Sequence, residues 1–156
     1  MSESYEVVFE QVAMGDLPGV LAHLQASADA VLELTVSEYL GDSGKDGIDK
    51  ALIEVIIAHA SDVCLTAQLH GFQVSEHISL AVVLLRVLKY GGAVDVELSF
   101  DTVTPADVEH VMFAMQAYAK ALSADFHVTA FFGGLEPAAD IESRYFTGDV
   151  LGPLGV

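Results

Sequence analysis

Basic residues are the scarcest feature of this sequence. Its 156 residues include 6 Lys and Arg against 23 Asp and Glu, so the formal net charge at pH 7 is −17. A protein that binds a phosphate backbone needs clusters of Lys and Arg to displace counterions, and the sequence has no such cluster. The composition therefore excludes nucleic acid binding through a basic face. The same argument excludes attachment to an anionic membrane surface.

Cysteine and long hydrophobic runs are also nearly missing. Cys64 is the single cysteine, which excludes an internal disulfide and predicts a reducing compartment, the cytoplasm. The longest apolar runs, such as residues 80–85, fall far short of the ~20 residues that cross a bilayer. The acidic start of the chain, residues 1–4, is unlike a secretory signal. We therefore predict a cytoplasmic protein that does not associate with membranes.

What the chain has in excess is apolar residues. They make up 53% of the sequence, and the mean hydropathy is +0.48. This length suits one domain with a sizeable core, so we predict a single domain over residues 1–156. Since large exposed apolar patches usually mark contacts, the excess also indicates an apolar interface, and a homodimer is one form that it could take.

The clearest pattern is a strand, a helix and a second strand between residues 91 and 134. Apolar and polar residues alternate through residues 93–101, which predicts a strand with one buried face. Thr104 and Pro105 are typical of a helix start, and apolar residues then recur with helical spacing as far as Leu122. Alternation returns in residues 126–132 and predicts the next strand.

The other elements follow from similar patterns. The predicted strands are residues 5–12, 31–39 and 63–72; the predicted helices are residues 18–26, 48–60 and 76–90; and residues 41–47 form a glycine-rich loop. Residues 76–90 are apolar on nearly every side, which is typical of a helix deep in a core or an interface. For residues 133–156 we predict an irregular C-terminal tail that packs on the body or on a neighbouring subunit.

The order and spacing of these elements predict the fold class. The inward residues Leu32, Leu65, Val96 and Val128 recur at intervals of 31 to 33 residues, as stacked strand-plus-helix units would give. Each strand has a polar second face, whereas strands of doubly covered parallel sheets are apolar on both faces. We therefore predict a two-layer α/β or α+β sandwich, with a four- to five-stranded sheet and helices mainly on one face.

The polar second face of the sheet is the candidate binding site. Its acids and histidines are Glu33, His70, Asp95, Glu97, Asp101 and His127. Imidazole titrates near neutral pH and a carboxylate can orient it, so His70, His127 and Asp95 could also serve an enzyme. The sequence contains no recognisable catalytic, metal-binding or cofactor motif, and we predict neither a metal nor a cofactor.

Three functions remain open, and no stretch carries the signature of a known family. We favour an acidic protein-binding module, similar in role to an immunity protein or inhibitor, that neutralises a basic partner such as a toxin domain or nuclease. The first alternative is a small-molecule enzyme or ligand carrier that uses the histidines of the polar face. The second is a self-assembling structural protein that uses its apolar surplus.

Overall fold

One antiparallel sheet and three helices make up the computed structural model, which describes residues 3–38, 47–101 and 107–155. The sheet has eight strands in the order β2-β3-β4-β5-β1-β6-β7-β8. The strands are β1 (Ser4–Glu10), β2 (Ala30–Val36), β3 (Val63–Gln73), β4 (Ser79–Tyr90), β5 (Ala93–Asp101), β6 (Ala130–Leu135), β7 (Arg144–Thr147) and β8 (Val150–Leu151). The helices are α1 (Leu17–Ala26), α2 (Lys50–Ala58) and α3 (Val108–Asp125), and two short 3-10 turns, η2 (Ile141–Ser143) and η3 (Pro153–Gly155), lie near the C-terminus.

The predicted mixture of helices with a sheet is confirmed, but the predicted sheet of four to five strands is wrong. The stacked strand-plus-helix units are also wrong, because every pair of neighbouring strands is antiparallel. β3, β4 and β5 follow one another as hairpins with no helix between them. Strands joined by short turns pair antiparallel, whereas parallel pairing needs a long crossover.

The largest error concerns residues 76–90, predicted as a helix: Ser79–Tyr90 form strand β4. Val83, Leu85 and Val87 are buried, as a half-buried strand requires. Val82 and Leu84 point the other way and are exposed, although they are apolar too. Apolar residues on the exposed side conceal the period of two, so the sequence reads as apolar on every side.

β6 begins four residues later than the strand predicted at residues 126–132. α3 runs to Asp125, and the backbone N–H of Phe126 still donates to the carbonyl of Leu122. Gly133 and Gly134 lie inside β6, where β7 passes very close. A Cβ on Gly133 would lie 2.5 Å from the ring of Phe146, and one on Gly134 would overlap the backbone of Ser143.

The C-terminal residues extend the same sheet. In the region 133–156, for which an irregular tail is predicted, the described residues 133–155 complete β6 and then form η2, β7, β8 and η3. The side chain of Phe146 on β7 is buried with the main core.

β2 is interrupted by a bulge between Leu32 and Thr35, where Glu33 has a φ of 54°. The extra residue changes which side chains face inward. Val31, Leu34 and Val36 pack against the core, whereas Leu32, predicted as an inward residue, is exposed.

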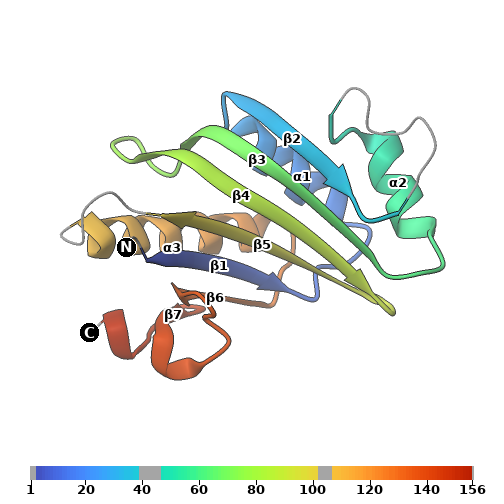
Figure 1. Ribbon diagram of the computed structural model, residues 1–156. Helices are drawn as coiled ribbons and strands as arrows, with labels where there is room; N and C mark the ends of the chain where they lie inside the picture. The colour runs from blue at the N-terminus through green and yellow to red at the C-terminus, as the bar shows by residue number, and fades with distance from the viewer. Residues whose placement is uncertain (1–2, 39–46, 102–106, 156) are drawn as a thin grey trace.

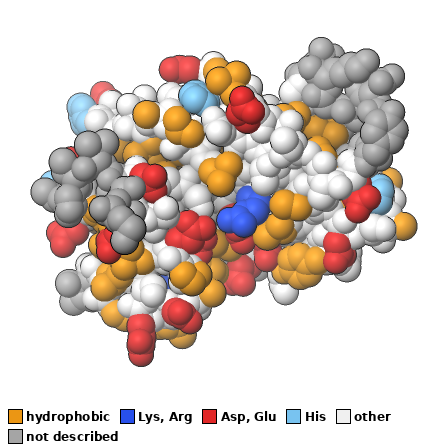
Figure 2. Space-filling view, viewed as in Figure 1, with side chains coloured by type: hydrophobic (Ala, Val, Ile, Leu, Met, Phe, Trp, Pro, Cys, Tyr) orange, Lys and Arg blue, Asp and Glu red, His pale blue; other side chains and the backbone are white. Residues whose placement is uncertain are grey.

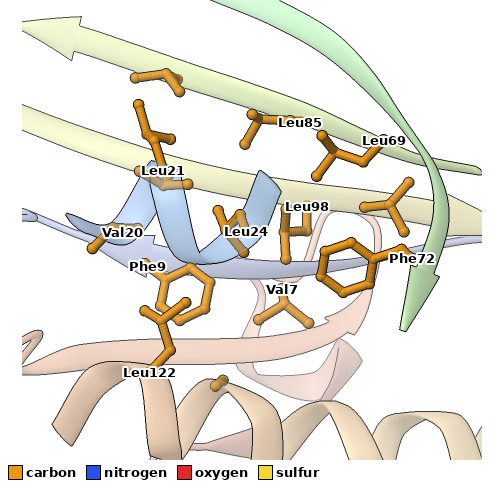
Figure 3. Packing of buried hydrophobic residues seen from close by; sticks show 14 of the residues in the cluster. Val7, Phe9, Val20, Leu21, Leu24, Leu69, Phe72, Leu85, Leu98 and Leu122 are labelled. Carbon is orange, nitrogen blue, oxygen red and sulfur yellow. The ribbon is translucent and has the colours of Figure 1, made fainter. Parts of the chain in front are cut away.

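All three helices lie on one face of the sheet and share one core with it (Figure 1). Figure 3 shows Leu21 and Leu24 of α1 and Leu122 of α3 among the inward side chains of the strands. The predicted apolar stripe of α3 is confirmed, with Val111, Met115 and other members buried. The predicted start of this helix at residues 104–106 and most of the loop 41–47 lie outside the described residues. Within the described part, no helix combines the length and apolarity needed to cross a membrane.

Candidate protein-interaction surface

The side of the sheet opposite the helices is open over strands β2 to β5, and we call this surface the open face. Pairing between strands places its side chains in rows, because directly opposed residues point to the same side. One row contains Thr66, Arg86 and Glu97, and the next contains Gln68, Leu84 and Ser99. Figure 2, seen from the same direction as Figure 1, shows hydrophobic and acidic side chains spread across the molecule and few basic ones.

The structure brings together four of the six predicted site residues. Asp95, Glu97 and Asp101 alternate along β5 with buried residues and so share the open face, and His70 lies on the same side of β3. Glu33 is exposed at the bulge of β2, the edge strand, which β3 and β4 separate from β5.

His127 is in a different place. It follows the end of α3 with a φ of 58°, and its Nδ1 lies 3.6 Å from Asp16 at the start of α1. The prediction that His127 shares a face with His70 and Asp95 is therefore wrong. It failed because the strand predicted at residues 126–132 begins only at Ala130. Alternation through residues 126–132 would also put Phe131 on the same face as His127, but Phe131 is buried in the core.

Hydrogen bonds within the protein fix two of the acids on β5. Asp95 accepts hydrogen bonds from the backbone N–H of Gln11 at 2.8 Å and from the hydroxyl of Tyr90 at 2.9 Å. The bond to Asp95 is the main cause that raises the pKa of Tyr90. Asp101 accepts from the hydroxyl of Ser4 at 2.8 Å. These bonds hold the carboxylates in place while leaving their negative charge on the surface.

A cluster of charges lies where the open face borders β1 and the residues after β6, and in it Arg86 is surrounded by Glu6, Glu97 and Glu136. Its Nε lies 3.3 Å from Glu97 and its Nη2 lies 3.6 Å from Glu136. Burial is the main cause that raises the pKa of Glu97, and the positive charge of Arg86 opposes it. Burial also raises the pKa of Glu6, against a hydrogen bond from the backbone of Ala138 at 2.7 Å. One guanidinium therefore faces three carboxyl groups, and this Arg86 cluster is negative when they are ionised.

The residues after β6 cover the neighbouring part of the sheet. Val8, Phe132 and Ala138 form a small buried cluster on the side away from the helices. The guanidinium of Arg144 lies 3.9 Å from the centre of the Phe132 ring, and its Nε donates to the carbonyl of Ala138 at 2.8 Å. This cover ends at the Arg86 cluster, so the surface from β2 to β5 remains accessible.

Sequence reasoning missed two features of this surface, and both lie on β4. The first is Arg86, the one basic side chain that the described part of β2 to β5 presents on the open face. The second is an apolar row, which we call the β4 stripe, consisting of Val82, Leu84, Leu88 and Tyr90. Counting every second residue from 82 to 90 could have revealed both features.

The structure supports binding better than chemistry at this site. Among the described residues, no group of three or more His, Cys, Asp and Glu side chains is arranged to hold a metal ion. His23, His77 and His110 line a separate groove of about 980 Å³ between α3 and the β3–β4 turn, on the helical side. His70 makes a hydrogen bond of 3.0 Å to Gln68. The open face is thus a broad, acidic and partly apolar surface of the kind that contacts another macromolecule.

Comparison with known proteins gives two matches. The model of a family described as the PABL017 Cdi1I immunity protein matches residues 3–151. The chain is also similar to a chain in the crystal structure of the toxic C-terminal tip of CdiA from Pseudomonas aeruginosa in complex with immune protein. The two chains are 38% identical with a TM-score of 0.93, and the match covers 99% of each. No curated protein matches the chain.

Proposed function

The chain belongs to the family of the PABL017 Cdi1I immunity protein, and we propose that it acts by binding the basic surface of a CdiA-type toxin tip through its open face. The immunity or inhibitor function predicted from the sequence is confirmed by this family. An immunity protein needs only to bind its toxin and keep it from its target, so it requires no catalytic residues. The proposal assigns that contact to the surface around Asp95, Glu97, Asp101, Glu33 and His70.

The observation that carries the proposal is the charge of this surface. Three acids of β5 and the Arg86 cluster lie on one open face of a chain whose net charge is −17. A negative surface attracts a positive partner over the distance of the Debye length, about 8–10 Å at physiological salt, and raises the rate of encounter. The same charge disfavours contact with other acidic proteins.

The two alternative functions receive less support. An enzyme that uses His70 and His127 together would need both rings at one site, and they lie on different sides of the sheet. A homodimer through the open face would bring two acidic surfaces together, which costs free energy. Self-assembly is therefore an outcome to be measured alongside toxin binding.

The first test uses purified protein and two toxins: the protein encoded by the neighbouring reading frame and the CdiA tip from P. aeruginosa. Binding kinetics are compared between wild type and the double variant Asp101→Asn/Glu33→Gln, which leaves the Arg86 cluster unchanged. We expect association with the bound toxin to slow by about threefold to tenfold, because part of the attracting field is lost.

The matched control for this test is Glu54→Gln/Glu109→Gln. It also removes two negative charges, but from exposed positions on α2 and α3. If both double variants slow association equally, only the net charge matters and the open face is not the binding surface. If wild type binds neither toxin, the proposed partner is wrong.

A further inference from the structure

The β4 stripe is an unusual feature of the open face. Val82, Leu84 and Tyr90 are 41%, 38% and 43% exposed, and Leu32 on β2 is 49% exposed. Leu32 lies in the same row as Leu84, with Gln68 between them. Along a strand, residues 82 to 90 extend for about 27 Å. The apolar side chains thus form a band across the middle of the face, interrupted by Arg86.

Resting on the proposed function, we propose that the β4 stripe receives apolar anchor residues of the toxin and supplies most of the strength of the complex. Protein interfaces commonly have an apolar centre that carries most of the binding energy and a polar rim that carries little. The open face has this arrangement, since β5 places Asp95, Glu97 and Asp101 along one side of the stripe.

The charges beside the stripe decide which partner fits it. A second copy of this chain would place its own β5 acids against those of the first, and Arg86 is the only Lys or Arg side chain that the described part of β2 to β5 presents on the open face of each copy. A toxin surface with an apolar centre and Lys or Arg around it meets both requirements at once. The occupant is therefore a basic protein surface with apolar side chains at its centre.

The stripe and the acids have separate kinetic roles. Long-range attraction by the acids acts on the rate of encounter and weakens with salt. Apolar contact acts only once the surfaces meet, so it governs dissociation, where most differences in affinity between related complexes arise. A change in the stripe should therefore be distinguishable from a change in the acids.

The experiment compares two double variants for binding to the toxin that wild type binds. Val82→Thr/Leu84→Thr makes the stripe polar with residues that suit a strand. Val150→Thr/Leu151→Thr makes the same change on β8, where these side chains are 69% and 50% exposed at the opposite edge of the sheet. We expect the stripe variant to dissociate at least about tenfold faster with an unchanged association rate, and the β8 variant to differ less than about twofold from wild type.

Three outcomes would overturn the inference. Unchanged dissociation of the stripe variant, while wild type binds, removes the stripe from the interface but leaves the proposed function intact. A wild-type dimer that the stripe variant abolishes without any effect on toxin binding would make the stripe a contact between copies. If the variant does not fold, methyl NMR of wild type decides, since the Leu84 methyl signals must shift when toxin is added. Absence of that shift in a formed complex also contradicts the proposal.

Discussion

At the scale of single residues, Arg86 has ion pairs with two carboxylates, more than any other basic residue in the described part of the chain. Replacement by Met keeps the apolar part of the side chain and removes the charge, leaving Glu97 partly buried without its partner. Removing one member of a partly buried pair destabilises the fold. The Arg86 side chain is 34% exposed and screened by water, so we expect a loss of only about 1 kcal/mol at neutral pH. Urea denaturation measures this loss.

The pH dependence of the same variant follows from the raised pKa of Glu97. Without Arg86 that pKa rises further, because the guanidinium is what lowers it. A carboxyl group whose pKa is raised by folding favours the protonated form, so its ionisation reduces stability as pH rises through that pKa. The loss of stability in Arg86→Met should therefore become smaller as the pH falls below the pKa of Glu97.

Lys50→Met is the control, since its pair with Glu54 at 3.9 Å is exposed and should contribute almost nothing to stability. Equal losses in the two variants would contradict the role given to Arg86.

At the scale of elements, the pairing of β6 with β7 depends on the absence of a side chain at Gly134. A Cβ on Gly134 would overlap backbone atoms of Ser143 and Arg144, which cannot move without separating the two strands. We expect Gly134→Ala to lower the free energy of unfolding by about 2 kcal/mol or more, measured by urea denaturation. In Gly92→Ala, the control, a Cβ has no atom within 4 Å, so its effect should be small. Similar stability of the two variants would show that β7 can shift at little cost.

The same elements show how far sequence patterns reach. β5 and α3 were predicted well, because in each the buried residues follow the period of the element and few of the exposed ones are large and apolar. β4 was not, because most of its exposed residues are apolar and hide the alternation. The strand β6 was predicted too early in the chain. Its glycines, Gly133 and Gly134, are needed because β7 approaches closely, and they do not mark a turn.

Site residues follow the same rule. The β5 acids were found from local alternation alone, and the fold then brought His70 to the same face. Arg86 and Glu136 were missed because their meeting depends on the pairing of β4 with β5 and on the return of the chain after β6. His127 was misplaced by a register error of a few residues. Local periodicity identifies which side chains are exposed, and long-range pairing decides which of them meet.

At the scale of the whole molecule, the charge of −17 opposes folding, and under the proposed function it favours binding to a basic toxin. Like charges repel one another in the folded state, which is more compact than the unfolded chain. Salt screens this repulsion, since the Debye length falls from about 14 Å near 0.05 M to about 4 Å near 0.5 M. Free protein should therefore become more stable over this range of sodium chloride, with a higher midpoint of thermal unfolding.

Attraction to a basic toxin is screened by the same ions, so the complex should respond in the opposite sense. We expect the association rate to fall by about tenfold or more between these salt concentrations. The dissociation rate should change much less, because apolar contacts at the β4 stripe are not screened. Stopped-flow kinetics measures both rates, and Glu54→Gln/Glu109→Gln should keep nearly the full salt dependence, since its removed charges lie on α2 and α3. An association rate that does not depend on salt would mean that the acids of the open face do not guide the toxin, whatever holds the complex together afterwards.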